Sequence, residues 1–510
     1  MSIEIAKDSL NLNQIIEQKK DSFIIEDDCI VPDIKPDILN IINYSGTVCI
    51  YKKEIMDGKI KIDGSVNAYL MYLADTEENE VRSLNTNLDF SKVIEINNIN
   101  NNMTLDVNVV LKAIDCRILN GRKINIKATL GIEVKVLSNE SVEYINEIKN
   151  VKDVQCLKKD FQINSLIGSG STKIYAKDTL TIDQVDNLVE IMKADLKIIN
   201  KDTKISYNKV LIKLDLAVKL LYLTEDNRIN MVEGIIPIMG FIDLPNISDN
   251  HTCDVKYEIK NIIVKPNNVE DHSVYVEAEV EAFCEAYENR SINIIQDLYS
   301  PSMDLSFKQK SIKVMQTKKV MQQTCNIREQ QRIPEIGSNQ IYDVEVIPTI
   351  EKQTVLKDRI LYEGEVNLNF IYAKNKTNGI DTKKIVIPFN FNMEFEGVNP
   401  NMSIDTIIEI TMQDFIVMPD ETIEVKIDLK FNASTSTNAN ISIIEEIEQS
   451  QKANLQTYSM IIYFTKEGDT LWKIAKRFNS TVEKIQKLNE IENVHNLPIG
   501  RQLFIPRYHG

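Results

Sequence analysis

One alternating pattern of apolar and polar residues occurs three times in the chain, at intervals of 150 residues. Each copy ends in a tyrosine, at Tyr72, Tyr222 and Tyr372. An apolar residue at every second position is the pattern of a β-strand with one face on a hydrophobic core. The preceding apolar positions are Ile60, Ile62, Gly64, Val66, Ala68 and Leu70 in the first copy, Val210, Ile212, Leu214, Leu216, Val218 and Leu220 in the second, and Ile360, Tyr362, Gly364, Val366, Leu368 and Phe370 in the third. The chain is therefore expected to form the same core strand three times.

A second alternating pattern repeats in the same order, at residues 124–132, 274–282 and 423–431. Three copies of one strand-rich unit of about 150 residues explain both patterns. A unit of that length can bury its own core, so we predict a mainly β fold with three tandem, sandwich-like domains. The predicted domains span residues 1–150, 151–305 and 306–431.

The C-terminal residues have a different pattern, in which two short helices lie between two strands, at 460–466 and 502–506. The hydroxyl of Thr470 can cap the first helix, and Ser480 begins a capping box, Ser-Thr-Val-Glu, for the second. This order, the turn Gly-Asp-Thr-Leu and the closing Leu-Pro-Ile-Gly-Arg-Gln-Leu-Phe-Ile-Pro resemble a LysM module over residues 458–508. The family usually has valine where this chain has Thr465. The resemblance implies a small βααβ domain that binds N-acetylglucosamine polymers such as peptidoglycan or chitin.

The resemblance to LysM also implies where a ligand binds, because the family's groove lies between the turn after the first strand and the loop before the last. The corresponding residues here are Gly468, Asp469, Thr470, Leu471, Asn489, Ile491, Leu497 and Pro498. Two alternatives remain open for this groove: it holds acetamido groups of a glycan, or it docks a protein. Trp472, the only tryptophan, likewise has two interpretations, a sugar-stacking platform or an anchor over the small core.

A segment of small polar residues precedes this module. Residues 432–440 read Asn-Ala-Ser-Thr-Ser-Thr-Asn-Ala-Asn, a composition typical of a flexible tether. Isoleucines then follow at helical spacing among glutamates, which predicts a short acidic helix over residues 441–455. We therefore expect a linker at 432–457 that separates the module from the β units.

Charge and composition restrict the function and the compartment. The net charge is −16, and residues 458–510 carry eight Lys/Arg against five Asp/Glu, so that the module is at +3 and the rest at −19. An acidic body disfavours nucleic acid as a partner, since phosphate binding needs a basic face. The N-terminal residues lack the pattern of a signal peptide, no apolar run is long enough for a membrane span, and the seven cysteines are odd in number and scattered. We expect a cytosolic protein.

Candidate catalytic and metal-binding groups are few. The closest grouping with the donor atoms that zinc prefers is His251, Cys253, His272 and Cys284. The repeat provides a control, because the other copies have Met103 and Met402 where the second has His251. Cys284 likewise corresponds to Val134, so these are apolar strand positions. We predict no metal site, no cofactor and no catalytic residue.

The lead-in Val31-Pro32-Asp33-Ile34-Lys35-Pro36-Asp37-Ile38, the repeated strand-rich units and the single C-terminal LysM resemble one family of endospore-forming bacteria. Its units are known as DUF3794 domains, and its members are spore coat morphogenetic proteins of the SpoIVA-interacting protein L type. The counterparts of the lead-in near 180–189 and 327–336 are degenerate, which restricts any function of that motif to the first unit.

The resemblance implies a non-enzymatic scaffold in the mother-cell cytoplasm. Such a scaffold links the forespore surface to the assembling coat through the SpoIVA ATPase and other spore coat proteins. The alternative is a peptidoglycan-binding or cell-wall-remodelling protein whose catalytic unit has no recognisable motif. Sporulation-specific expression of the gene would distinguish the two.

Overall fold

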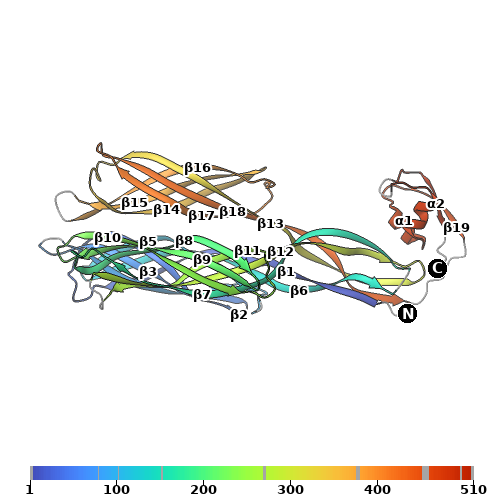
Figure 1. Cartoon of the computed structure of the whole chain (residues 1–510), viewed down its shortest axis with the longest axis horizontal. Coiled ribbons are helices and arrows are strands. Elements are labelled where there is room, and N and C mark those ends of the chain that lie inside the picture. The colour runs from blue at the N-terminus through green and yellow to red at the C-terminus, as the bar shows by residue number, and fades with distance from the viewer. Residues whose placement is uncertain are drawn as a thin grey trace.

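A computed structural model describes residues 4–77, 80–101, 103–150, 153–267, 272–374, 379–450, 459–493 and 497–506. The fold is mainly β, as predicted, and consists of three six-stranded units and a βααβ module (Figure 1). The first unit comprises β1 (Glu4–Ile30), β2 (Ile38–Met56), β3 (Lys59–Ala74), β4 (Val81–Glu95), β5 (Thr104–Asn120) and β6 (Lys123–Lys149). The second comprises β7 (Gln155–Thr181), β8 (Leu188–Ser206), β9 (Lys209–Thr224), β10 (Ile229–Asp243), β11 (Thr252–Pro266) and β12 (Ser273–Tyr299). The third comprises β13 (Asp304–Arg332), β14 (Ile341–Leu356), β15 (Arg359–Ala373), β16 (Ile380–Glu394), β17 (Ile404–Val417) and β18 (Thr422–Ser450).

Each unit folds into two antiparallel three-stranded sheets with the same topology. In the first unit the strand orders are β2-β3-β4 and β1-β6-β5, and the other two units repeat them. The two alternating sequence patterns form the central strand of each sheet, so their apolar residues face one another across a separate core in every unit. Tyr72, Tyr222 and Tyr372 are each the fourteenth residue of their strand and are all buried, which confirms the predicted register of the repeat.

The first and last strands of every unit are far longer than the sandwich that they help to build. Strands of 27 to 29 residues reach roughly 90 Å when extended. Their outer halves leave the sandwich as two-stranded ribbons and pack together into what we call the stalk (Figure 1). The stalk consists of residues 4–15 with 137–149, 155–164 with 289–299, and 304–315 with 438–450. Its core contains apolar residues of all three ribbons, among them Leu10, Ile163, Ile294, Ile312 and Ile443.

Two predictions about the segment before the module differ from the structure of the stalk. The flexible tether at 432–440 and the acidic helix at 441–455 are wrong over the described residues, because β18 continues to Ser450 and pairs with β13 throughout. The third unit therefore does not end at residue 431. Ile441 and Ile443 alternate on one face of a strand and are buried among the other ribbons, so tertiary packing decides their structure. Residues 451–458 lie outside the described residues.

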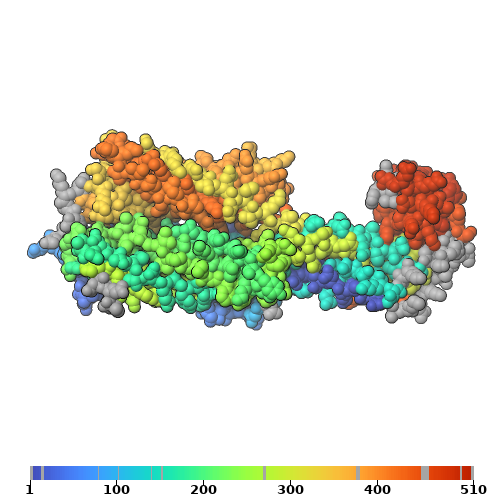
Figure 2. Space-filling view, in the orientation of Figure 1, coloured from blue at the N-terminus to red at the C-terminus, as the bar shows by residue number. Residues whose placement is uncertain are grey.

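Ion pairs close the three units into a ring. One aspartate in each unit accepts a lysine of a neighbouring unit, and the three contacts run in one direction around the ring. The pairs are Lys256–Asp106 at 2.5 Å, Lys318–Asp254 at 2.6 Å and Lys135–Asp405 at 2.7 Å. A buried pair, Lys193–Asp343 at 2.7 Å, joins the second and third units near the centre. The ring and the stalk together make the units parts of one body, with the module at the tip of the stalk (Figure 2).

Candidate ligand-binding surfaces of the C-terminal module

The C-terminal module consists of β19 (Met460–Phe464), α1 (Leu471–Arg477), α2 (Val482–Leu488) and β20 (Gln502–Pro506). Thr470 caps α1 as predicted, since its hydroxyl accepts a hydrogen bond from the Lys473 amide at 3.2 Å. The cap of α2 is Thr481 and not Ser480, which was predicted to begin the capping box. Ser480 is buried, and its hydroxyl donates to the carbonyl of Pro506 at 2.7 Å, so it ties the helices to β20 instead.

The predicted groove has one wall in the turn before α1. Gly468 takes the left-handed conformation, with φ at 78°, that the turn requires. The carboxylate of Asp469 accepts the backbone N–H of Lys466 and the hydroxyl of Tyr463, both at 2.8 Å. These hydrogen bonds, that of Lys466 above all, lower the pKa of Asp469. Asp469 therefore holds the turn in place, and its Oδ2 accepts both hydrogen bonds.

The other wall is the loop that leads into β20. Asn489 supports it, because its amide donates to the carbonyl of Phe504 at 2.7 Å and its oxygen accepts the Phe504 N–H at 2.7 Å. Thr465, the residue that departs from the LysM pattern, joins the two walls: its hydroxyl donates to the Pro498 carbonyl at 2.5 Å and accepts the Arg501 N–H at 2.9 Å. A valine could form neither bond, so the departure strengthens the connection between turn and loop.

The eight predicted groove residues have two different roles in the structure. Leu471 and Ile491 are buried in the module's core, and Asp469 and Asn489 serve the framework through the hydrogen bonds above. The side chains that remain available to a ligand are Leu497, Pro498 and the exposed Thr470, whose hydroxyl also caps α1, beside the exposed backbone of Gly468. The accessible part of the groove is thus smaller than predicted, and it is largely backbone and apolar surface.

A second surface of the module is apolar and was not predicted. Met460, Ile462 and Phe464 point outward from β19 and are 50%, 57% and 57% exposed, and Phe504 lies directly opposite Ile462 on β20. The helices cover only the other face of this two-stranded sheet, where Ile461 and Ile505 contribute to the core. The sequence carried a signal for it, since β19 is apolar at every position and not at alternate ones.

A third surface of the module is docked on the stalk. The indole Nε1 of Trp472 donates to Asp297 at 2.7 Å, and the ammonium of Lys476 lies 2.5 Å from the other oxygen of the same carboxylate. Tyr299 packs edge-on against Trp472, with ring centroids 5.0 Å apart, and its hydroxyl donates to the carbonyl of Ser480 at 2.9 Å. Trp472 thus anchors the module to the stalk as well as covering its core, and its indole N–H is not available to a sugar.

The four residues considered as zinc ligands do not form a metal site in the described part of the body. The imidazole of His251 accepts the Ser248 amide at 3.1 Å, and that of His272 bonds to the carbonyl of Asp186 at 2.8 Å, so both histidines have local partners. Within the residues that the structure describes, no three His, Cys, Asp or Glu side chains cluster as a metal site requires. Cys284 is buried in the core of the second unit, as its apolar counterpart would be.

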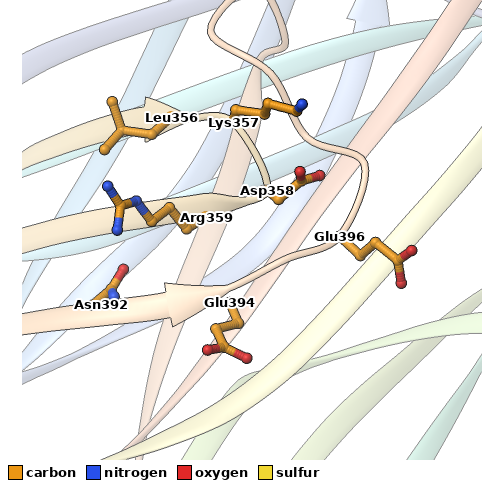
Figure 3. Close-up of a pocket in the computed structure, with 7 residues that line it drawn as sticks. All are labelled: Leu356, Lys357, Asp358, Arg359, Asn392, Glu394 and Glu396. Carbon is orange, nitrogen blue, oxygen red and sulfur yellow. The ribbon is translucent and has the colours of Figure 1, made fainter.

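One surface hollow lies at the tip of the third unit, at the β14–β15 hairpin and the end of β16 (Figure 3). Its side chains diverge, and Asp358 is engaged by the Gly397 N–H at 2.7 Å. Its lining has mixed charge, with three carboxylates beside a lysine and an arginine. The lining residues are Leu356, Lys357, Asp358, Arg359, Asn392, Glu394 and Glu396.

Comparison with protein-family models identifies both kinds of unit. The model described as SipL, SPOCS domain matches residues 37–119, 187–267 and 339–418, which contain the second to fifth strands of each unit. The LysM domain model matches residues 463–506. Neither the curated proteins nor the solved structures include a match to this chain. In the described part of the chain, no helix has the length and apolar character of a membrane span.

Proposed function

We propose that this chain, which has the architecture of the SpoIVA-interacting protein L family of spore coat morphogenesis proteins, is a non-enzymatic scaffold. That architecture consists of three SipL SPOCS domains and a C-terminal LysM domain. The scaffold binds the coat-basement ATPase SpoIVA through the LysM module. The observation that carries the proposal is the presentation of the module. It is docked at the tip of the stalk, away from the three sandwiches, and the docking contact leaves two of its surfaces uncovered.

In this proposal the module and the three-unit body have separate binding roles. The module engages the ATPase at the forespore surface, on the mother-cell side, and the three-unit body presents an extended surface to other spore coat proteins. Ion pairs between neighbouring units and a shared stalk core hold the three units together. An extended body of this kind suits a protein that sets the distance between a basement layer and the coat above it.

A protein partner is favoured over a glycan for the module. The module's charge of +3 suits an acidic protein surface, and the apolar β19–β20 face offers the kind of area that protein interfaces bury. Trp472, the aromatic group best suited to stack on a sugar, is committed to Asp297. A partner that polymerises also presents many copies, so that weak individual contacts add through avidity.

The proposal is tested by measuring equilibrium binding of the full chain to purified SpoIVA-type ATPase and to purified peptidoglycan. Pro498→Asp alters the accessible groove and Ile462→Asp alters the apolar face, and neither residue is buried. We expect at least one of the two to weaken ATPase binding tenfold or more, while Glu483→Gln on the exposed side of α2 leaves it unchanged. Binding of peptidoglycan alone, lost in Pro498→Asp, would establish the glycan alternative instead. Release of labelled fragments from peptidoglycan would establish the remodelling enzyme.

A further inference from the structure

The outward face of β10, in the second unit, carries a row of exposed apolar side chains. Met231, Ile235, Met239 and Phe241 are 45%, 60%, 76% and 47% exposed. Leu211 of the neighbouring β9, itself 43% exposed, lies directly opposite Phe241 and extends the row onto a second strand. We call these five residues the β10 stripe. In Figure 2 the second unit, in green, has a broad surface that neither the third unit nor the module covers.

The other two units show that the fold does not need this stripe. At the positions of the four β10 residues, β4 of the first unit has three polar side chains and a valine, and β16 of the third has three polar side chains and a valine. The counterparts are Ser83, Asn87, Ser91 and Val93 in β4, and Thr382, Val386, Asn390 and Asn392 in β16. The core of the second unit is supplied by the alternate residues of β10, such as Ile236 and Ile238, which are buried. The stripe is therefore an addition to the second unit and not a consequence of its folding.

The size of the stripe is that of an interaction site. Five large side chains at these exposures present apolar area on the order of 500 Å², near the upper end of the largest patches on monomeric proteins. The other units form the same sandwich with mostly polar residues at these positions, although Ser83, the counterpart of Met231, is buried and donates to the carbonyl of Ile191 at 3.0 Å. Such a patch is stable in solution only at a cost in solubility, so a partner that covers it is expected.

The partner approaches the face of β10 and not its edge. β10 is the edge strand of its sheet, and an open edge could pair with another strand. Pro237 interrupts that edge at the middle of the stripe, because proline has no N–H to donate to a further ladder. Close packing beneath also occupies the inner side, where Gly234 and Gly240 lie against Leu180 and Ile174 of β7. Side chains, and not backbone, therefore make the contact.

The charges in and around the stripe are balanced. Glu233 lies on the same face between Met231 and Ile235 and pairs with Lys219 at 3.4 Å. Lys213 lies opposite Met239 and Asp215 opposite Pro237, while Lys209 covers the ring of Phe241 at 4.1 Å and pairs with Asp243 at 3.6 Å. A face that is neutral and apolar offers no complement to a strongly acidic or basic partner. It does complement itself, because a twofold rotation places the apolar centre of one stripe on that of another.

We propose that the β10 stripe is a homodimer interface, in which two copies of this chain pack the second units face to face about a twofold axis. Two stripes would bury roughly 1,000 Å² of apolar surface and its surroundings, near the lower limit for a specific interface. The dimer is expected to be moderately stable and concentration-dependent. It leaves both modules, at the tips of the two stalks, free to bind, so a dimer would present two modules to a repetitive partner.

Sedimentation equilibrium of the full chain tests this proposal. We expect a reversible monomer–dimer equilibrium in the wild type and a dissociation constant raised at least tenfold in the double variant Ile235→Glu with Met239→Glu. The matched control is Asn87→Glu with Ser91→Glu, at the same positions of the first unit, and it should dimerise like the wild type. Circular dichroism and the thermal midpoint establish that each variant is folded.

Three results would overturn the interface: a wild type that stays monomeric up to about 100 µM, a dimer that the β10 variant leaves intact, or a dimer that the control weakens equally. The inference stands apart from the proposed function. A monomeric β10 variant should still bind the ATPase through its module with unchanged affinity per site, so failure of one proposal is distinguishable from failure of the other.

Discussion

Replacing Asp297 with alanine should release the C-terminal module from the stalk while leaving both parts folded. Asp297 lies near the end of β12, where its carboxylate receives both the indole N–H of Trp472 and the ammonium of Lys476. No other contact of the module with the stalk involves a charged pair of this kind among the described residues. The module stays covalently joined to the stalk, so its release changes its position and not the composition of the chain.

The magnitude follows from the two bonds that are lost. A hydrogen bond to a charged acceptor contributes about 1.5–3 kcal/mol, and a partly exposed ion pair contributes about 0.2–1 kcal/mol. The side chains of Asp297 and Lys476 are 25% and 40% exposed, which puts their pair toward the weaker end. A loss of about 2–3 kcal/mol corresponds to a shift of roughly 30- to 150-fold in the docking equilibrium. Asp297→Asn retains an acceptor for Trp472, so it should have an intermediate effect.

Tryptophan fluorescence measures this release directly, because Trp472 is the only tryptophan and lies at the contact. Undocking exposes the indole, so the emission of Asp297→Ala should shift to longer wavelength and acrylamide should quench it more strongly. The control is Glu147→Ala, at the equivalent position of the first ribbon, which has no contact with the module among the described residues. If emission and quenching of a folded Asp297→Ala matched the wild type, the docked arrangement would not exist in solution.

Three further outcomes are expected. Leu471→Asp should unfold the module alone, since an unpaired buried carboxylate costs several kcal/mol, and circular dichroism of the chain should retain the β signal of the three units. Asp343→Ala should destabilise the body by about 1.5–3 kcal/mol in urea unfolding, because the buried Lys193 loses one of its two carboxylate partners and keeps Asp195 at 2.8 Å; an unchanged free energy of unfolding would contradict the structure. Folding lowers the pKa of Asp469, so its carboxylate stabilises the module above the unfolded pKa near 4, and this stabilisation is lost as the pH falls through the folded pKa. Asp469→Asn should remove this pH dependence from the unfolding of the module, followed by Trp472 fluorescence.

The sequence predicts the repeating sandwich well because a period of two is a local property. Each alternating run commits one face to a core, and the interval of 150 residues aligns the three copies without knowledge of their contacts. The predicted βααβ order is likewise local, since its caps and turn glycine act within a few residues. The cap of α2 was misplaced by one residue because Ser480 and Thr481 are both suitable caps, and only the distant Pro506 decides between them.

The stalk could not be predicted from local composition. Ala433 and Thr435, where β18 leaves the sandwich for the stalk, alternate on a buried face, but small residues carry so little apolar signal that the segment resembled a tether. The docking contact was missed for a different reason. Asp297 lies 175 residues before Trp472 in sequence, and no local pattern marks an aspartate as the partner of a distant indole. Long-range pairing of this kind becomes visible only when the ribbons bring the chain ends together.

The predicted groove residues fall into a structural group and a ligand-accessible group for a physical reason. A small fold has few residues to spare, so a position near its ligand groove often also holds the framework. Asp469 and Asn489 illustrate this, because their side chains satisfy backbone groups of the turn and of β20. A sequence resemblance marks such positions without distinguishing those that contact a ligand from those that shape the site.

Co-sedimentation with the polymerised SpoIVA-type ATPase tests the proposed function most directly. The full chain is compared with a chain that ends at Ser450, which retains the three units and the whole stalk. We predict that the full chain sediments with the polymer in a saturable manner and that the truncated chain stays in the supernatant. If the truncated chain sedimented with undiminished affinity, the module would not be the part that binds the ATPase.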